Sequence, residues 1–600
     1  MTTSQATLDL LESAAASGAL QASSVKNIRR WLTDPAFAEY APRVAELLEQ
    51  QQHEQLNDVF WTVIPFGTGG RRGTMFEVGS NAINERTMGE SAAGLAAYVK
   101  EQVNDVGEFA CAIAHDTRHN SERFARLSAE IMAAAGFRVW YLDGFRSTPE
   151  LSFAVRYKNC NCGIMITASH NPPADNGFKA YWATGGQILP PHDAGVIERV
   201  MSIETIARTP FDEAVAAGQI VLCQDEVGEA FLAAVGEQAF AGPRDLKLIY
   251  SPLHGVGASG VMPALKADGF EEVELFAPHA APDGDFPNVP KHVSNPENPE
   301  VFDALIERAQ VSGAEFVMAT DPDGDRVGCA SPVTLDASGE WETFTGNQIG
   351  ALLADYILAR HQEAERLNVR SYVVKTLVTT ELIRRIADKY HVRTCGNLLV
   401  GFKWIGMTMD EQGPGGFVFG AEESHGYLVG QYARDKDGVV ASMLLAEVAA
   451  SAGAEGKSLR EKLDALFAEH GVHAEHTVSV VMPGAEGMQA MQALMARVRE
   501  NPPQSIGGLA VTQVRDYLGQ TVLRADGTVD RLEGPQGDMV IIDLEEEGNY
   551  VAIRPSGTEP KVKFYLFAYQ PPQEDVAAGR QAMAARLEAL EADLNKLAKG

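Results

Sequence analysis

Gly163-Ile164-Met165-Ile166 runs directly into Thr167-Ala168-Ser169-His170-Asn171-Pro172-Pro173, and this junction sets the expected architecture of the chain. The first four residues form an apolar run that is typical of a buried strand. Ser169 then lies in the loop at the carboxyl end of that strand, which is the edge where open α/β sheets bind their ligands. The junction therefore predicts an α/β fold that presents a serine hydroxyl to a ligand.

The neighbours of Ser169 distinguish it from a serine in an ordinary polar turn, which is a common feature. His170 and Lys179 supply nearby basic or cationic groups. The pair Asn171-Pro172 stiffens the loop, so the hydroxyl can be presented in one geometry. We interpret Ser169 as a nucleophile.

A second apolar run, Phe316-Val317-Met318-Ala319, leads into Asp321-Pro322-Asp323-Gly324-Asp325-Arg326. An EF-hand calcium loop would need a glutamate at its twelfth position, which Pro332 occupies here. Three carboxylates on alternate residues, with a phosphate oxygen completing the coordination, suit Mg²⁺. Arg326 adds a fixed positive charge beside that phosphate. A hydroxyl nucleophile and a hard-metal site together predict phosphoryl transfer through a phosphorylated serine.

Three further loops carry polar groups that could bind a sugar phosphate. Arg554-Pro555-Ser556-Gly557-Thr558, with Lys561, offers the cations, hydroxyls and free N–H groups that a phosphate dianion needs. Glu422 and Ser424 could recognise sugar hydroxyls through hydrogen bonds. The Gly-rich basic run 66–73 is a weaker signal. The alternative for the loop 554–561 is a turn between strands. For Glu422 and Ser424 it is a solvated strand end, and for residues 66–73 it is a flexible linker.

Composition limits the partners of the chain. Its net charge of -31 argues against nucleic-acid binding, and it means that an anionic substrate needs local positive charge. Six cysteines in 600 residues do not make a disulfide framework, and Cys160 and Cys162 lack a second pair at zinc spacing. The N-terminus has no basic region, and the sequence has no apolar run of membrane-spanning length. We expect a cytoplasmic protein without a membrane partner.

The length of 600 residues predicts several domains. Alternating strand and helix patterns predict parallel βαβ units in three successive α/β blocks with mixed or parallel sheets, followed by a block whose strands look antiparallel. The predicted division is a helical N-terminal extension at 1–60, α/β domains at 61–205, 206–328 and 329–465, and an α+β domain at 466–600. In order, the four domains carry the serine loop, the metal loop, the sugar loop and the phosphate loop.

Taken together, these motifs resemble the α-D-phosphohexomutase superfamily from about residue 60 to about residue 570. Five motifs in the family's order argue against chance similarity. They are a GT-x-G-x-R loop ending at Arg72, the TASHNP serine loop, the DPDGDR metal loop, a GEES-type sugar loop and the RPSGTEP phosphate loop. Flanking runs look most like the α-phosphoglucomutase branch: Lys179–Trp182, Gln187-Ile188, Thr345–Asn347, Gly401-Phe402-Lys403 and Arg434–Gly438.

The resemblance implies four domains around a central cleft, and a phosphoryl group on Ser169 held against one Mg²⁺ by Asp321, Asp323 and Asp325. Transfer to the substrate's free hydroxyl would give a hexose 1,6-bisphosphate, which turns over and returns its other phosphate. Arg72, Lys179 and Lys436 match family positions near the reacting groups, and His170 adjoins the nucleophile. The implied substrate contacts are Arg326, Gly401, Lys403, Glu422, Ser424, His425, Arg554, Ser556, Gly557, Thr558 and Lys561.

Two departures from the family pattern occur in the sugar loop. Ala421 replaces the usual glycine before Glu422, which matters little for the chemistry. His425 follows Ser424 directly, whereas members with a catalytic-type histidine in this loop have it one residue later. His425 is therefore a candidate only, and a buried, hydrogen-bonded histidine is the alternative.

The leading functional hypothesis is interconversion of α-D-glucose 1-phosphate and glucose 6-phosphate. Mannose phosphates are the closest alternative, because one hydroxyl at C2 distinguishes the two sugars. Pentose phosphates come third, since that branch carries alanine where Ser424 stands. A non-catalytic sugar-phosphate sensor and a metal-dependent phosphatase are hypotheses of other classes. The sequence makes no prediction of the oligomeric state.

Overall fold

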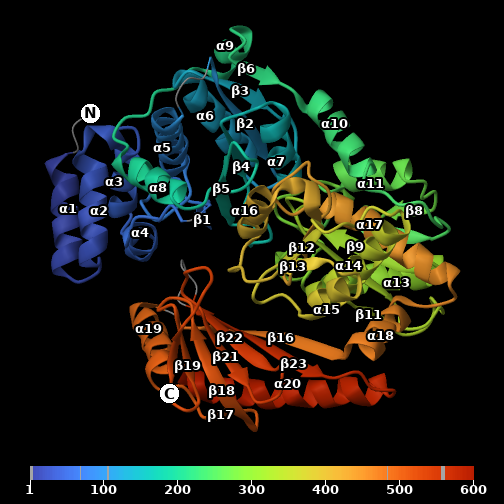
Figure 1. Ribbon diagram of the computed structural model, residues 1–600. Helices are drawn as coiled ribbons and strands as arrows, with labels where there is room; N and C mark the ends of the chain where they lie inside the picture. The colour runs from blue at the N-terminus through green and yellow to red at the C-terminus, as the bar shows by residue number, and fades with distance from the viewer. Residues whose placement is uncertain (1–3, 68, 104–106, 483, 556–560, 600) are drawn as a thin grey trace.

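The computed structural model describes residues 4–67, 69–103, 107–482, 484–555 and 561–599. Four β-sheets follow one another along the chain, after a helical unit at the N-terminal end (Figure 1). The first three sheets belong to α/β units, and the fourth is an antiparallel sheet with helices against one face. The predicted fold class is confirmed.

The N-terminal unit is helical and packs around its own apolar core, which includes Trp31 and Phe60. Its last helix is joined to the first α/β unit by main-chain bonds, such as the one from Asn81 N to Val59 O at 2.8 Å. The main helices are α1 (Gln5–Ala16), α2 (Ala22–Thr33), α3 (Ala41–Glu49) and α4 (His53–Phe60).

The first sheet has the order β1-β5-β4-β2-β3-β6. Strands β2, β3, β4 and β6 run parallel, as the alternating pattern predicts, whereas β5 returns antiparallel to β4 and β1 pairs antiparallel with β5. Because both faces are covered, the central strands are apolar throughout: Ile113 and Ile164 face one core, and Ala112 and Met165 face the other. The strands are β1 (Gly70–Thr74), β2 (Phe109–His115), β3 (Phe137–Tyr141), β4 (Cys162–Ile166), β5 (Asp175–Trp182) and β6 (Ile220–Leu222), and the helices are α5 (Glu85–Gln102), α6 (Ser121–Ala134), α7 (Thr148–Tyr157), α8 (His192–Ser202), α9 (Phe211–Ala216) and α10 (Gln224–Gly236).

The second and third sheets have the orders β11-β10-β9-β7-β8 and β13-β12-β14-β15. The second unit comprises β7 (Leu248–Ser251), β8 (Val273–Leu275), β9 (Phe316–Thr320), β10 (Val327–Pro332), β11 (Trp341–Thr343), α11 (Ala258–Ala267), α12 (Ala277–Ala280) and α13 (Asp303–Ser312). The third comprises β12 (Tyr372–Lys375), β13 (Arg393–Cys395), β14 (Phe417–Glu422), β15 (Gly426–Leu428), α14 (Gly346–Glu363), α15 (Leu382–Lys389), α16 (Phe402–Gln412), α17 (Gly438–Ala454) and α18 (Leu459–His470). One apolar core continues from the first unit through both of these.

Apolar side chains of the fourth sheet point alternately to its two faces, and each face packs against a different partner. Ile542 and Phe564 pack against the two C-terminal helices, while Ile541 and Tyr565 pack against Leu377 of the third unit. The elements are β16 (Val472–Val481), β17 (Ser505–Ile506), β18 (Leu509–Asp516), β19 (Thr521–Arg524), β20 (Val529–Arg531), β21 (Val540–Leu544), β22 (Tyr550–Pro555), β23 (Lys561–Gln570), α19 (Gly484–Glu500) and α20 (Val576–Lys599). In Figure 1, α20 runs along the lower edge of this unit and α19 stands at one side of the sheet. The face that carries Ile541 and Tyr565 is directed toward the third unit.

The predicted division of the chain stays a prediction, and two sheets extend past its boundaries. Strand β6 joins the first sheet beyond residue 205, and β11 joins the second beyond residue 328. Each of these edge strands has only three residues, so its pattern in the sequence is faint.

Within the described ranges, no single helix combines the length and hydrophobicity that a membrane span requires. Helices α17 and α18 reach that length only as a pair, and the chain bends by 87° between them.

Candidate active site

The serine loop begins where β4 ends, as the sequence predicts. Ser169 has a left-handed backbone with φ of 52° and is 2% exposed. Its N–H donates to Thr167 Oγ1 at 2.8 Å, and the Thr167 hydroxyl donates in turn to Asp116 Oδ2 at 2.5 Å. These bonds hold Ser169 in a backbone conformation that an L-residue seldom adopts.

The metal loop begins where β9 ends, and it meets the serine loop directly. Ser169 Oγ donates to Asp321 Oδ2 at 2.7 Å and lies 3.2 Å from His170 Nδ1. Carboxylate oxygens of Asp321, Asp323 and Asp325 all lie within 4.8 Å of one another. The nucleophile and the acidic triplet, which stand about 150 residues apart in the sequence, therefore form one site.

The acidic triplet fits a hard divalent cation. Oδ1 of Asp323 and Oδ1 of Asp325 are buried and have no hydrogen-bond partner in the part of the chain that the structure describes. Burial, together with the neighbouring carboxylates of Asp323 and Asp325, raises the pKa of Asp321 well above its ordinary value. A divalent cation would engage the orphan oxygens and offset this repulsion, which is what oxygen-rich metal sites do. The other such cluster among the described residues, His119, Asp283 and Asp285, lies near the surface.

Two lysines neutralise part of the triplet's charge. Lys179 Nζ lies 2.6 Å from Asp323 Oδ2, and Lys436 Nζ lies 2.8 Å from Asp325 Oδ2. Burial acts to lower the pKa of each lysine, but the carboxylates beside them outweigh it and raise both pKa values. For Asp323, burial acts in the opposite sense, yet Lys179 and hydrogen bonds hold its pKa well below the ordinary value. Both lysines are therefore cations in this arrangement.

His170, next to the serine, carries a neutral imidazole. Burial, with the nearby Arg326 and Arg72, lowers the pKa of His170 well below its ordinary value. A neutral imidazole whose Nδ1 lies beside Ser169 Oγ can accept a proton from it, or return one.

A cavity of about 1050 Å³ brings together residues from all four sheet units. Ser169, Arg72 and Lys179 line it from the first unit, and Gln55 and Asp58 of α4 close one side. From the remaining units come Asp325, Arg326, Lys436 and Arg554. Its volume suits a sugar carrying two phosphates, and its cations provide the local positive charge that the acidic chain as a whole lacks.

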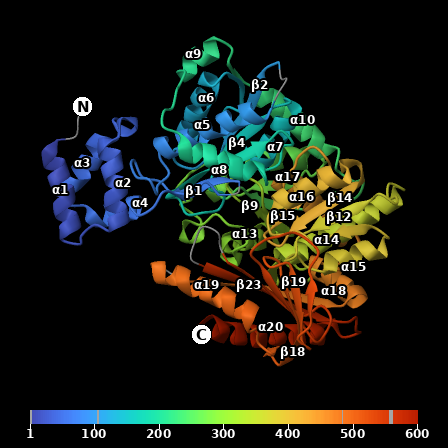
Figure 2. The ribbon, with the colours of Figure 1, turned by 60° about the vertical axis from the view of Figure 1, so that its left-hand side comes forward.

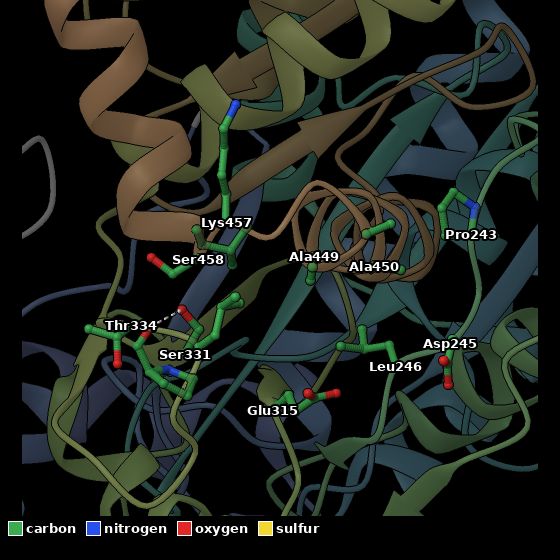
Figure 3. Close-up of a pocket in the computed structure, with 15 residues that line it drawn as sticks. Pro243, Asp245, Leu246, Glu315, Ser331, Thr334, Ala449, Ala450, Lys457 and Ser458 are labelled. Atoms are coloured by element: carbon green, nitrogen blue, oxygen red, sulfur yellow. Dashed lines mark hydrogen bonds between the residues drawn. The ribbon is translucent and has the colours of Figure 1, made fainter.

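A second cavity, of about 420 Å³, lies at the junction of β10, α17 and the segment 243–246 (Figure 3). Figure 3 shows Leu246, Ala449 and Ala450 around it, with Ser331 and Ser458 at one side. None of the predicted site residues lines this cavity, so the candidate site is the larger one.

The sugar-loop residues lie beside that larger cavity and are not among the residues that line it. Gly401 N donates to Glu422 Oε1 at 2.9 Å, which joins two predicted segments. Ser424 stands in the turn between β14 and β15 and is half-buried, and burial lowers the pKa of Lys403. His425 is 5% exposed, and its Nδ1 lies 3.1 Å from Val327 O, as in the buried alternative.

The structure describes part of the phosphate loop. Ser556, Gly557 and Thr558 lie outside the described residues. Arg554 at the end of β22 lines the cavity, and Lys561 begins β23, which pairs antiparallel with β22.

Several contacts of the site could not be read from the sequence. Thr148 Oγ1 donates to Asp323 Oδ2 at 2.6 Å, and Arg326 is paired with Glu297. Tyr181 OH donates to Asp435 Oδ2 at 2.8 Å and thereby joins the first and third units. The sequence around Thr148 signals only a helix start, through Ser147 and Pro149.

Comparison with known proteins identifies the relatives of this chain. Family models described as phosphoglucomutase/phosphomannomutase alpha/beta/alpha domains I, II and III match residues 64–207, 229–333 and 345–470, respectively. The chain belongs to this family. A phosphoglucomutase of Staphylococcus aureus (strain MRSA252) is 33% identical over 90% of this chain and 96% of its own length. A phosphoglucomutase of Staphylococcus haemolyticus is 35% identical over 87% of this chain and 93% of its own length.

Solved structures show the same fold. The open form of a Paramecium phosphoglucomutase, pp63/parafusin, has a TM-score of 0.63, at 17% identity over 88% of this chain and 94% of that one. Family membership and these relatives establish that the chain is a phosphosugar mutase, an isomerase that transfers phosphate intramolecularly. The family and the buried acidic triplet together fit a metal cofactor.

Proposed function

We propose that this mutase interconverts α-D-glucose 1-phosphate and glucose 6-phosphate through a phosphorylated Ser169 and glucose 1,6-bisphosphate. The observation that carries the proposal is the 2.7 Å contact between Ser169 Oγ and Asp321 Oδ2, because Asp321 belongs to the acidic triplet whose carboxylate oxygens lie within 4.8 Å of one another. The names of the Staphylococcus relatives support glucose as the sugar.

Asp321, Asp323 and Asp325 would hold Mg²⁺, which would neutralise charge on the phosphoryl group during transfer. Lys179 and Lys436 add fixed positive charge on the same side of the cleft, and Arg72 lines the cavity near them. Phosphoryl transfer depends chiefly on such positioning and charge stabilisation. These side chains therefore bind and orient the phosphoryl group.

In the first transfer, the free hydroxyl of the sugar attacks phosphorus and the bond between phosphorus and Ser169 Oγ breaks. The proton of that hydroxyl leaves it, and Ser169 Oγ regains one. His170 is placed to donate a proton to Ser169 Oγ or to accept one from it, because its neutral Nδ1 lies 3.2 Å from that oxygen. The bisphosphate then reverses its orientation in the cleft. In the second transfer, its other phosphoryl group passes to Ser169 Oγ, and the proton movements are reversed.

The other end of the substrate would be held by the phosphate loop and the sugar loop. Arg554 lines the cavity, and we assign the distal phosphate to it together with Ser556, Gly557, Thr558 and Lys561. Glu422 and Ser424, with Gly401 and Lys403, are proposed to recognise the sugar hydroxyls.

A substrate panel tests this proposal. The purified enzyme, with Mg²⁺ and a trace of hexose bisphosphate, is assayed side by side on glucose 1-phosphate, mannose 1-phosphate and ribose 1-phosphate. We expect the largest kcat/KM with the glucose compound. Preference for the mannose or ribose compound would overturn the sugar assignment, and steady release of inorganic phosphate would indicate a phosphatase.

A further inference from the structure

The side chain of Arg118, which follows β2, lies beneath the serine loop and donates to main-chain carbonyls of that loop. Its Nη2 donates to Ser169 O at 2.6 Å, and its Nε lies 3.2 Å from the same oxygen. Its Nη1 donates to Pro172 O at 2.8 Å and to Asp175 O at 3.1 Å, and its Nη2 also donates to Asn171 O. One guanidinium thus donates hydrogen bonds to main-chain carbonyls throughout the turn that presents the nucleophile.

Arg118 is itself fixed by Asp116. The side chains of both residues are fully buried, with Arg118 Nε 3.5 Å from Asp116 Oδ2. Asp116 also accepts the main-chain N–H of Arg118 at 3.0 Å and the hydroxyl of Thr167 at 2.5 Å. Because Thr167 accepts the N–H of Ser169, one carboxylate supports the loop by two routes.

The second unit covers this arrangement from outside. The Phe286 ring lies 5.1 Å from the Arg118 guanidinium and is fully buried. The adjacent His119 contacts Asp285 at 2.7 Å. A Cβ on Gly284 would lie 2.6 Å from His119 N, so only glycine allows the two segments to approach so closely. The segment 283–286 therefore seals the side of Arg118 that faces away from the loop.

We propose that Arg118 is a positioning residue for phosphoryl transfer, which holds the serine loop so that Ser169 Oγ stays against the acidic triplet. Several carbonyl oxygens that converge in a buried turn repel one another, and the left-handed backbone of Ser169 adds strain. The planar guanidinium, with its five N–H donors, satisfies these oxygens at once, whereas a lysine ammonium has three donors and no fixed plane. The inference rests on the proposed role of Ser169 as nucleophile.

The expected signature is a fall in kcat with little change in KM. Arg118 donates to the back of the loop and is not among the residues that line the cavity, so substrate binding does not depend on it directly. Displacement of a reacting group by about 1 Å lowers the rate by roughly a hundredfold. We therefore expect that Arg118→Lys loses activity on that order and phosphorylates Ser169 at a correspondingly lower rate.

The experiment compares Arg118→Lys and Arg118→Ala with the full-length wild type and with Arg123→Ala. Arg123 lies five residues further on, in α6, and its exposed side chain pairs with Glu85, so this control removes the same charge without touching the loop. The readouts are kcat, KM, and the single-turnover rate at which hexose bisphosphate phosphorylates the dephosphorylated enzyme. Guanidinium ion added to Arg118→Ala should restore part of kcat, since it can occupy the vacated space.

Wild-type kcat in Arg118→Lys, or a rise in KM at constant kcat, would overturn the proposal. If Arg118→Ala gives no folded protein, Arg118→Lys carries the test, provided that its circular dichroism and Tm match those of the wild type. Ser169→Ala is assayed alongside. Turnover by that variant would refute the nucleophile itself, whereas an inactive Ser169→Ala with a fully active Arg118→Lys refutes only the role of Arg118.

Discussion

At the scale of single residues, the site depends on one hydroxyl held between two loops. Ser169 is nearly inaccessible, and Thr167, Arg118 and Asp321 bond to its N–H, its carbonyl and its hydroxyl, respectively. A residue fixed at every polar atom has little freedom to relax. Changes to its side chain should therefore act on chemistry rather than on folding.

Ser169→Ala should abolish turnover while leaving the fold intact. The change removes a loop hydroxyl and no core volume, and loss of a nucleophile commonly lowers kcat by about a thousandfold or more. Intact-mass spectrometry should show a phosphoryl adduct on the wild type after incubation with hexose bisphosphate, and none on the variant. Near-normal activity of Ser169→Ala would refute the assignment.

Removal of divalent metal should abolish activity and lower Tm. Asp321, Asp323 and Asp325 would then face one another without a cation, and Lys179 and Lys436 neutralise only part of their charge. After dialysis against a chelator, Mg²⁺ should restore both activity and Tm. Full activity in a preparation that elemental analysis shows to be metal-free would contradict the metal assignment.

The sequence revealed the residues whose chemistry depends on local spacing. Ser169 and the acidic triplet each follow an apolar strand, and both were found by that pattern. Arg118 and Thr148 were missed because their partners are main-chain carbonyls or a carboxylate far along the chain, and neither kind of contact leaves a spacing pattern. Lys179 was noted as a basic group near Ser169 and also matches a family position, yet its pairing with Asp323 needed the fold.

At the scale of elements, the antiparallel pair β1–β5 carries Arg72 and Lys179 to the cleft. Gly177, in the middle of this pairing, is packed against main chain on two sides. A Cβ there would lie 2.7 Å from Arg71 O and 2.7 Å from Thr167 O. Strand β1 and the first residue of the serine loop therefore approach β5 more closely than a side chain at Gly177 would allow.

Gly177→Ala should lower the free energy of unfolding by about 1–3 kcal/mol, the usual effect of overpacking, and should reduce kcat because both flanking segments carry site residues. Denaturant titration and steady-state kinetics measure the two effects. The control is Gly236→Ala in α10, where an added Cβ meets open space. We expect the control to stay within about 1 kcal/mol of the wild type. Equal effects of the two substitutions would contradict this account.

Strand β16 carries a buried histidine, His473, whose Nδ1 lies 2.9 Å from Gly471 O and whose ring packs against Tyr569. Burial lowers the pKa of His473 from 6.5 to about 3. Above pH 6.5, which is the pKa of the imidazole in the unfolded chain, the imidazole is neutral in both the folded and the unfolded state, so the pKa shift has no effect on stability. As the pH falls from 6.5 toward 3, the unfolded chain binds a proton that the folded chain does not, and the folded state loses stability.

His473→Phe should therefore make folding less sensitive to acid. Between neutral pH and about pH 5, the wild type should lose about 2 kcal/mol more of its free energy of unfolding than the variant does. The reason is that pH 5 lies about 1.5 units below the pKa of the histidine in the unfolded chain. Urea titrations at both pH values provide the measurement, and the difference at neutral pH supplies the baseline for lost packing. Parallel pH dependence in the two proteins would show that burial does not depress this pKa.

At the scale of the whole molecule, all four sheet units contribute residues to one cavity. The helical unit lies beside the first sheet unit (Figure 2). The fourth unit contributes Arg554, and its sheet packs on the third unit through Tyr565 and Leu377. A substrate that bridges Ser169 and Arg554 would connect the first unit with the last. The distance between the two phosphates of the substrate then decides whether one can bind at Ser169 while the other binds at Arg554.

Arg554→Ala should raise KM roughly tenfold to a hundredfold, since hydrogen bonds to charged groups contribute about 1.5–3 kcal/mol. Phosphorylation of Ser169 at saturating bisphosphate should change much less. Arg531→Ala is the matched control, because Arg531 is exposed on β20 of the same unit. An unchanged KM for Arg554→Ala would refute the assignment of the distal phosphate to this loop.

The order of the blocks and their fold class could be predicted because apolar strands and periodic helices repeat along the chain. The reversal of β5 could not, since a strand that returns antiparallel after a loop reads like any other apolar run. The edge strands β6 and β11 were also missed as members of their sheets, because each is only three residues long and too short to give a clear pattern. The part played by α4, which lines the cleft through Gln55 and Asp58, had no signal in the sequence.

The cleft draws on both ends of the polypeptide, from Gln55 to Arg554. During synthesis, a ribosome-bound chain would already contain Ser169 and the acidic triplet long before Arg554 emerges. Such a nascent chain would lack the group to which we assign the far phosphate, so it should bind sugar phosphates more weakly than the finished protein does. Full affinity for the substrate would then be reached only once the final sheet has formed.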